Sequence, residues 1–339
     1  VTLGNIDGPD GNLLIGQSGL VQGDVTQADG TRLRINGLSI GTLGLIELSS
    51  AENDFAVAES IDANGNITLL DSANGLDVRQ VRSGGGDVDL RSTATDFAIL
   101  ISGVIATGRG DVRITAGEQI RMRDTATIDA GDGTIQVDAA DDVTLGSLVT
   151  TNATENAVRI QSSAGAISDG GDTDLDIDAN FGRVTIMAAT GIGDGNSIDM
   201  RVAEFSAKVT DRGAIQITEQ DSVHLIELET FDGEIVVTAA DSIVIDDDRP
   251  EDQNGPFAVT PRLIAGGTDG RIRLDAGNEE GDRLRIGNGV GLVASQSSLG
   301  AVQLDAAAIE FGEQIEIRTG GDVGVARVFS PRPVLPADL

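Results

Sequence analysis

A short glycine-led motif, Gly-x-(Ile/Val)-x-(Ile/Val/Leu), recurs along nearly the whole 339-residue chain. The first four glycines are 21, 24 and 23 residues apart, and from Gly182 onward the spacings lie between 20 and 37 residues. Spacing of this kind is typical of one solenoid coil with occasional insertions. We therefore expect each glycine to mark the same corner of successive coils. The motif begins at Gly65, Gly86, Gly110, Gly133, Gly182, Gly213, Gly233, Gly270, Gly300 and Gly321.

Within each coil, apolar and polar residues alternate strictly. The segment 133–138 alternates, a turn follows at 139–142, and alternation resumes at 143–145. A period of two is that of a strand with one buried face and one wet face, and the 45 glycines disfavour helices. The sequence therefore predicts an all-β fold, a right-handed parallel β-helix with about 20–24 residues per coil and loop insertions at its corners.

The repeat also predicts how the chain is organised. Residues 31–327 should form one elongated β-solenoid, because each coil packs only on its neighbours. Residues 1–30 do not follow the pattern and are predicted to form a cap or an assembly arm. Residues 328–339 are rich in proline and should form an extended tail. Three segments break the repeat and are predicted to be insertions: 146–156, 246–256 and 277–291.

Composition excludes several functions. The chain has 23 basic and 55 acidic residues, a formal charge of −32, so nucleic acids and anionic membrane surfaces would repel it. It has no apolar run of 18 residues, which argues against membrane insertion, and no cysteine, which excludes disulfides and thiol catalysis. We expect an extracellular protein of a bacterial cell surface, processed or excerpted from a longer chain because it begins at Val1.

One segment carries a family resemblance. Gly191-Ile-Gly-Asp-Gly-Asn-Ser-Ile-Asp-Met-Arg-Val-Ala-Glu-Phe-Ser-Ala207 resembles a unit of giant repetitive bacterial surface proteins similar to filamentous haemagglutinins. The resemblance implies a right-handed parallel β-helix of the adhesin type and localisation at the cell surface. It implies no particular ligand.

The sequence offers little for catalysis. His224 is the single histidine and is predicted to be a surface residue without a partner, so it would not support acid–base chemistry alone. The chain lacks Trp and Tyr, the flat side chains on which sugar rings stack. We therefore expect a protein that is not an enzyme. A polysaccharide-active β-helix is the alternative, because this fold can bring carboxylates of adjacent coils together.

Calcium is the candidate cofactor, because it takes six to eight oxygen ligands and favours Asp, Asn and backbone carbonyls in turns. None of the acidic clusters has a specific calcium-binding spacing, so solvated acidic turns remain the simpler interpretation. No other cofactor is expected. The candidate ligands are Asp7, Asp10 and Asn12 in the first cluster, Asp169, Asp172 and Asp174 in the second, and Asp246, Asp247 and Asp248 in the third.

The ends of a solenoid need explanation, because a terminal coil exposes unpaired backbone groups that template further stacking. No capping helix is evident at either end. The sequence therefore predicts a structural subunit that assembles with itself head to tail into a surface filament. Its alternatives are coils continuing in a longer adhesin, and a calcium-dependent adhesin stalk that contacts a glycan, a host surface or the matrix. The predicted interface residues are Leu13, Leu14, Ile15, Val328, Phe329, Pro331, Pro333 and Leu335.

Overall fold

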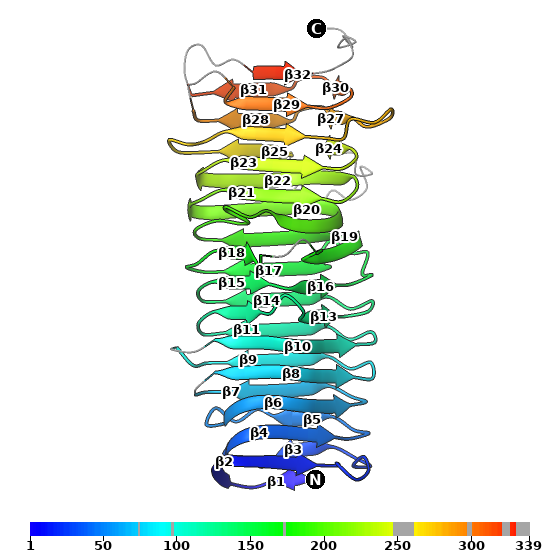
Figure 1. Ribbon diagram of the computed structural model, residues 1–339, viewed down its shortest axis with the longest axis vertical. Helices are drawn as coiled ribbons and strands as arrows, with labels where there is room; N and C mark the ends of the chain where they lie inside the picture. Colours follow the sequence, from blue (N-terminus) through cyan, green and yellow to red (C-terminus); the bar gives the residue numbers. More distant parts are fainter. Residues whose placement is uncertain are drawn as a thin grey trace. The chain divides into compact units, whose positions relative to one another are not determined.

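Parallel strands and tight corners make up the chain (Figure 1). The computed structural model describes residues 1–73, 75–95, 98–171, 174–246, 261–296 and 300–320, and the backbone of 326–329. Over these residues it contains no helix and about 13 turns of parallel β-solenoid, which confirms the predicted right-handed parallel β-helix. The same residues accordingly contain no helix that could cross a membrane.

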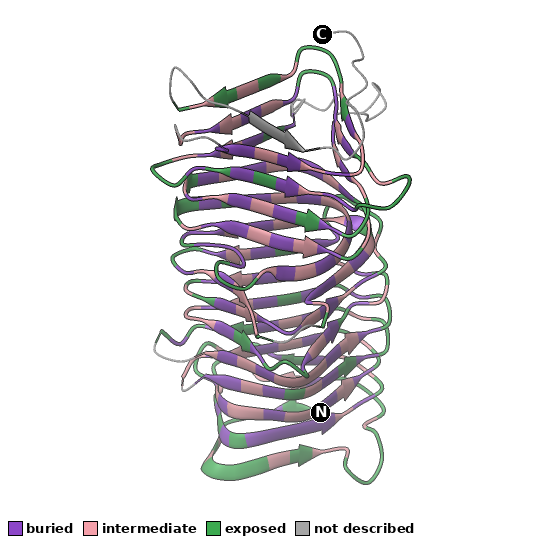
Figure 2. Cartoon of the chain, turned by 45° about the horizontal axis from the view of Figure 1, so that its top comes forward, coloured by how far each residue is buried: buried purple, intermediate pink, exposed green. Residues whose placement is uncertain are grey.

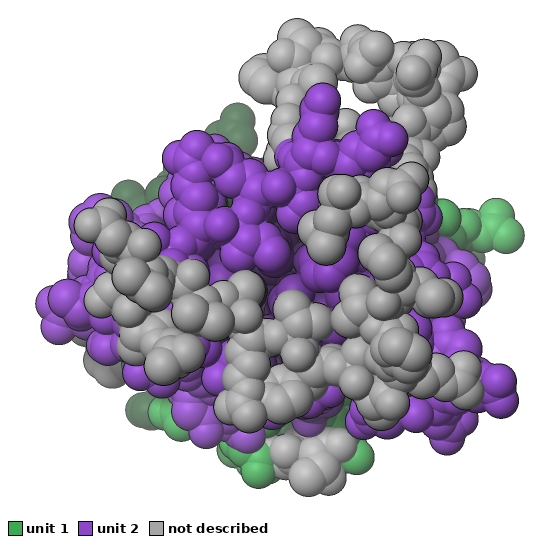
Figure 3. Space-filling view, turned by 90° about the horizontal axis from the view of Figure 1, so that it is seen from above, with its two compact units in different colours: residues 1–179 green, residues 180–339 purple. Residues whose placement is uncertain are grey.

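The chain divides into two compact units, Val1–Ala179 and Asn180–Leu339, which Figure 3 colours separately. Three strand ladders run through each unit, and every strand pair with a printed register is parallel. In unit 1 the first five coils combine two of the ladders in one long strand. From the sixth coil onward the long strand is replaced by two short ones.

The strands of unit 1 have the following bounds. The first ladder holds β1 (Thr2–Leu3), β3 (Val25–Gln27), β5 (Ile46–Leu48), β7 (Ile67–Asp71), β9 (Val88–Ser92), β11 (Val112–Ala116), β14 (Ile135–Ala139) and β17 (Val158–Ser162). The long strands are β2 (Ile6–Ile15), β4 (Leu33–Gly41), β6 (Asp54–Ala63), β8 (Leu76–Ser83) and β10 (Ile99–Thr107). The short strands are β12 (Ile120–Met122), β13 (Thr127–Asp129), β15 (Val143–Leu145), β16 (Ser147–Val149) and β18 (Ile167–Asp169), and β19 (Ile177–Ala188) begins here.

Unit 2 repeats the three-ladder arrangement with two long strands, β20 (Ile198–Arg212) and β22 (Val223–Asp232). One ladder continues through β21 (Ile215–Glu219), β23 (Ile235–Ala239), β26 (Ile272–Asp275), β29 (Val302–Asp305) and β32 (Ala326–Phe329). The others continue through β24 (Ile243–Ile245), β27 (Leu284–Ile286) and β30 (Ile309–Phe311), and through β25 (Arg262–Ala265), β28 (Gly291–Ala294) and β31 (Glu316–Thr319).

The core of each unit consists of aliphatic side chains stacked in register. Val112, Ile135 and Val158 align on three successive coils and are 1%, 0% and 0% exposed. The intervening Gln136 faces outward and is half-buried. The same alternation of buried and accessible positions can be followed along the strands in Figure 2. Because similar side chains align from coil to coil, the inward positions of the alternating pattern form a continuous aliphatic core from which water is excluded.

Two predicted insertions contain ladder strands. β16 lies within 146–156 and pairs with β13, and β27 lies within 277–291 and pairs with β24. Both strands have only three residues. A strand this short shows too few alternations to be recognised by period. Of the third predicted insertion, 246–256, only Asp246 lies among the described residues.

The ladders also extend into residues 1–30, the predicted non-repeat segment. β1 pairs with β3 and β2 pairs with β4, both in parallel register. The β2–β4 register shifts between Gly8 and Asn12, so this strand is bulged. Glycines and Pro9 interrupt its apolar pattern, although the backbone keeps its pairing. Its role as a cap or an assembly arm stays a prediction.

The motif glycines lie where successive corners touch. A Cβ atom on Gly110 would collide with the carbonyl of Gly86, and a Cβ atom on Gly133 would collide with the carbonyl of Gly110. Only glycine lets the coils approach this closely. Beside this corner, the carboxylate of Asp111 accepts a hydrogen bond from the N–H of Thr134 at 2.7 Å, which joins one coil to the next.

Replacing Ile135 with aspartate should destabilise unit 1 by at least about 3 kcal/mol, because the carboxylate would be buried without a partner. The measurement is urea unfolding followed by circular dichroism. Thr144→Asp is the matched control, because Thr144 is half-buried on an outward face beside Arg121. Equal midpoints for the two variants would contradict the inward assignment of Ile135.

Replacing Gly133 with alanine should lower the free energy of unfolding of unit 1 by about 1–3 kcal/mol, because the new methyl group collides with backbone that cannot rotate away. Gly23→Ala should be close to neutral, since a Cβ atom there meets nothing within 4 Å. Thermal unfolding of both variants tests whether close approach of successive coils requires glycine at position 133. An unchanged unfolding temperature in Gly133→Ala would refute this requirement.

Candidate functional site

The first coil of unit 1 is the candidate assembly site. Among the described residues, β1 pairs only with β3 and β2 only with β4, so the opposite edges of β1 and β2 have no strand beside them. Leu13 and Ile15 align with Leu38 and Ile40 of β4, which are 0% and 1% exposed. Leu13 and Ile15 themselves are only half-buried. The core is therefore open at this coil, much of which carries the exposed colour in Figure 2.

Two further apolar residues are exposed on the same coil. Leu14 is 59% exposed and Val1 is 57% exposed. Leu14 faces outward, because it pairs with Ser39 between the inward-facing positions Leu13 and Ile15. The predicted residues Leu13, Leu14 and Ile15 thus lie together on β2. Their role as an interface stays a prediction.

The predicted interface residues near the other end are only partly described. Val328 and Phe329 belong to β32 and align with Leu304 and Asp305 of β29, so their backbone continues a ladder instead of starting an extended tail. The first proline of this region is Pro331, and the residues before it keep the N–H groups that pairing requires. Pro331, Pro333 and Leu335 lie outside the described residues.

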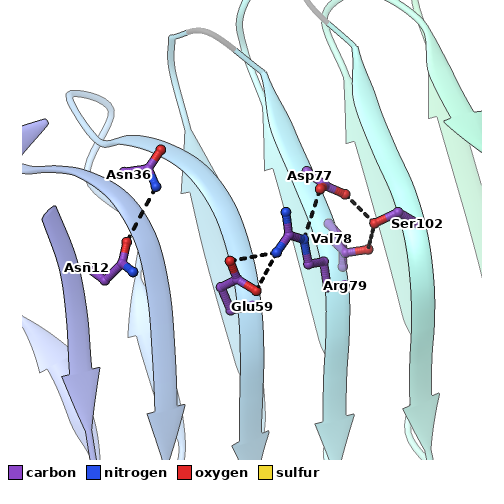
Figure 4. Close-up of polar contacts among 7 residues, drawn as sticks. All are labelled: Asn12, Asn36, Glu59, Asp77, Val78, Arg79 and Ser102. Atoms are coloured by element: carbon purple, nitrogen blue, oxygen red, sulfur yellow. Dashed lines mark hydrogen bonds and ion pairs between the residues drawn. The ribbon is translucent and has the colours of Figure 1, made fainter. Parts of the chain in front are cut away.

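The first predicted calcium cluster is spread along β2. The Asp7 carboxylate lies 3.7 Å from the Arg32 guanidinium, and Asp10 is exposed. The Asn12 side-chain oxygen accepts a hydrogen bond from the Asn36 amide at 3.4 Å (Figure 4). Two of the three predicted ligands are therefore engaged by the next coil.

The second predicted cluster borders a hollow in unit 1. Asp174 lines a hollow of about 420 Å³ together with Asp124, Asp176 and Asp178. Asp176 is only 3% exposed. The Asp169 carboxylate accepts a hydrogen bond from the backbone N–H of Gly171, with an N–O distance of 2.9 Å, and it does not line this hollow. Asp172 lies outside the described residues. An adjoining hollow of about 520 Å³ is lined by residues that include Arg121, Arg123 and Asp124.

The third predicted cluster corrects the interpretation of His224. Asp246 is 3% exposed, and its carboxylate oxygen Oδ1 lies 3.0 Å from His224 Nε2. Its other oxygen, Oδ2, lies 3.3 Å from Arg285 Nη1. The prediction that His224 lacks a partner is therefore wrong. Asp247 and Asp248 lie outside the described residues.

The repeat itself contains the signal for this pairing. His224 of β22 aligns with Val244 of β24, 20 residues later, and Asp246 follows two residues further on. Local sequence places no acid next to His224, and the pair becomes visible only when the chain is written coil under coil. Across the described part of the chain, no three histidine, aspartate or glutamate side chains lie close enough to hold one metal ion. Calcium binding stays a prediction.

A polar column on the long strands was not predicted. Arg79 Nη1 donates hydrogen bonds of 2.7 Å to both carboxylate oxygens of Glu59 on the preceding coil, and Arg79 Nε bonds Asp77 at 3.2 Å (Figure 4). Ser102 on the following coil donates to the Asp77 carboxylate. These bonds join three successive coils at the bend of the long strands.

Buried carboxylates form the other unpredicted feature. Asp71 is 0% exposed and accepts the N–H of Phe55 at 3.0 Å, and burial raises its pKa to about 6. Glu219 is 1% exposed and accepts the N–H of Val202 at 3.2 Å. Burial, followed by the neighbouring carboxylate of Asp221, raises the pKa of Glu219 to about 9. Asp71 ends β7 and Glu219 ends β21, and each accepts a hydrogen bond from the backbone of a long strand, β6 and β20 respectively.

Glu219 should make the stability of unit 2 depend on pH. Its pKa rises from an ordinary value of 4.5 in the unfolded chain to about 9 in the fold. The folded state therefore binds the proton more tightly, and the free energy of unfolding falls by a few kcal/mol as the pH rises from about 4.5 to about 9. Glu219→Gln should remove that slope, whereas the exposed control Glu313→Gln should keep it. Urea unfolding at pH 5 and pH 8 measures both, and an unchanged slope in Glu219→Gln would contradict this assignment.

Comparison with known proteins adds no family. A scan against protein-family models finds no match, and searches of curated proteins and of solved structures find none. The resemblance to filamentous haemagglutinins therefore rests on the segment 191–207 and on the class of fold. The structure includes residues 198–207 in β20, a strand with parallel partners. The chain is a parallel β-solenoid of about 13 turns.

Proposed function

We propose that this chain is a non-catalytic structural protein of the bacterial cell surface, which assembles with itself head to tail into a filament. The observation that carries the proposal is the open first coil. It offers the free edges of β1 and β2 and the half-buried core residues Leu13 and Ile15. Such an edge is a template for another parallel strand.

The energetics favour a second coil as the occupant of this surface. Covering the first coil would complete the burial of Leu13 and Ile15, each worth roughly 1 kcal/mol since both are already half-buried. It would also provide partners for a row of backbone N–H and C=O groups. The partner must itself be a parallel coil, because its strands must follow the bends of β2 at a spacing of about 4.8 Å.

A second copy of the chain can supply that coil. β30, β31 and β32 each have a strand partner on one side, namely β27, β28 and β29, and none on the other side among the described residues. Contact between two different surfaces of the same chain is heterologous, so it produces an open array. Sideways association is disfavoured, because the net charge of −32 makes the flanks of two copies repel each other.

Leu13→Asp should prevent assembly, because it places a carboxylate in the surface that a second coil would cover. Sedimentation velocity of the intact chain at increasing concentration should show large assemblies for the natural chain and monomers for the variant. The control Phe231→Asp changes another exposed apolar residue, 68% exposed, on β22, a strand with partners on both sides, and it should still assemble. A natural chain that stays monomeric at every concentration would reject the proposal.

A calcium-dependent adhesin stalk is the second candidate function. Its support is the negative charge of the hollow lined by Asp124, Asp174, Asp176 and Asp178, although no three described acidic side chains lie close enough to hold one ion together. Isothermal titration with calcium, repeated on Asp174→Asn, distinguishes the two functions. Binding that the variant loses would favour the adhesin, and assembly that is unaffected by chelator would favour the filament.

The polysaccharide-active alternative has one supporting observation, the adjoining hollow in which Arg121, Arg123 and Asp124 are near one another. Mixed cationic and carboxylate side chains can bind an acidic sugar and supply a proton acceptor. Release of reducing ends from acidic polysaccharides, lost in Arg121→Gln, would replace the structural proposal with an enzymatic one.

A further inference from the structure

Two neighbouring arginines of unit 1 lack the acidic partners that other arginines of this chain have. Arg79, Arg91 and Arg183, for example, each bind a carboxylate. The side chains of Arg121 and Arg123 make no ion pair or hydrogen bond within the part of the chain that the structure describes. In a chain with 55 acidic and 23 basic residues, two adjacent cations are therefore left available to an anion from outside the chain.

The strand register explains why Arg121 has no acid beside it. Arg121 aligns with Leu100 on the preceding coil and with Thr144 on the following coil, and neither residue carries a charge. By contrast, Arg113 on β11 lies 3.7 Å from the carboxylate of Asp138 on the following coil. The pairing of β10, β12 and β15 thus keeps the Arg121 guanidinium accessible to a ligand.

Both arginines line one hollow of about 520 Å³, here called the arginine hollow. Arg121 is exposed on the outward face of β12, and Arg123 is exposed at the start of the corner 123–126. The next coil has only Gly146 between β15 and β16, and a Cβ atom on Gly146 would lie 2.5 Å from the backbone oxygen of Arg123. Because this connection is so short, the next coil leaves the side of the corner uncovered, and a concave surface results.

The other residues of the arginine hollow have the chemistry of a sugar-binding site. Leu100 is half-buried and offers an apolar surface in a chain without Trp or Tyr. Thr125 and Thr144 offer hydroxyl groups, and the Asp124 carboxylate can accept hydrogen bonds from hydroxyl groups. A pocket of this volume with apolar surface and a few polar groups is typical of a small-molecule site.

The charges of the arginine hollow define the anionic group of its ligand. Two guanidinium groups, about 7 Å apart along an extended backbone, can both donate to one planar carboxylate between them. Asp124 lines the same hollow and repels a second anion nearby. The hollow that adjoins it is lined by Asp174, Asp176 and Asp178, so a densely sulfated polymer would extend over a negative surface. A ligand with one carboxylate and several hydroxyl groups fits both the cations and the acids.

We propose that the arginine hollow binds saccharides that carry a carboxylate, with Arg121 and Arg123 binding the carboxylate and Asp124 accepting hydrogen bonds from ring hydroxyls. This activity goes beyond filament assembly and does not depend on it, because no residue of the first coil lines the hollow. It also differs from the polysaccharide-active alternative, because the saccharide is bound and none of its bonds is broken.

Isothermal titration calorimetry of the intact chain at physiological salt tests the proposal with trigalacturonate as the probe. Trigalacturonate should bind, and the neutral trisaccharide maltotriose should not, because it lacks the carboxylate. Arg121→Gln and Arg123→Gln should each weaken binding of trigalacturonate by about tenfold, since each removes a charge-assisted hydrogen-bond donor. The matched control Arg113→Gln removes the same charge from a half-exposed arginine outside the hollow and should bind as the natural chain does.

Four results would overturn the site. They are no binding of trigalacturonate to the natural chain, equal affinity in the natural chain and in the Arg121→Gln/Arg123→Gln double variant, tighter binding of a triglutamate peptide, and release of reducing ends from the probe. The peptide result would replace the sugar with an acidic protein segment, and the last would replace binding with catalysis. Binding of trigalacturonate to a natural chain that stays monomeric in sedimentation would support the site while rejecting the filament, so the two proposals fail separately.

Discussion

Hydrogen bonding between successive coils, with like side chains in register, is the constraint on which the rest of the structure depends. Val112, Ile135 and Val158 stack on one another because their strands are parallel and unshifted. A parallel ladder needs partners on both sides of every strand, and each coil provides them for its neighbours. Among the described residues the first coil of unit 1 has no strand beside its outer edge, and this edge is the basis of the proposed assembly.

Polar side chains at the corners and bends serve the same stacking. Gly110 and Gly133 permit close approach, and Asp111 spans the gap to the next coil. Buried Asp71 and Glu219 bond backbone N–H groups of the long strands from inside the core. The high acid content is therefore partly structural, because carboxylates accept hydrogen bonds from the many N–H groups at the corners. An acidic cluster in the sequence is thus weak support for a metal site in this fold.

Much of the fold follows from the sequence, because the strict alternation after each motif glycine is a direct signature of half-buried strands. β16 and β27 were missed because three-residue strands are too short to establish a period. The partner of His224 was missed because it lies one coil away. The buried acids were missed because the alternating pattern predicts an apolar residue at an inward position such as that of Glu219. Contacts between coils can be predicted only after the register is known. Leu13 and Ile15, two of the predicted interface residues, lie on the first coil, and their role as an interface stays a prediction.

Electron microscopy of the intact chain in negative stain, with calcium and with chelator, tests the central claim most directly. If the open coil accepts a second copy, uniform unbranched fibres should form in both conditions, with a width that does not change as they lengthen. If the fibres disappear when chelator is added, ions bound by the acidic turns would hold the copies together instead of the open coil. Dispersed single particles in both conditions, at concentrations where sedimentation is also monomeric, would contradict assembly through the first coil.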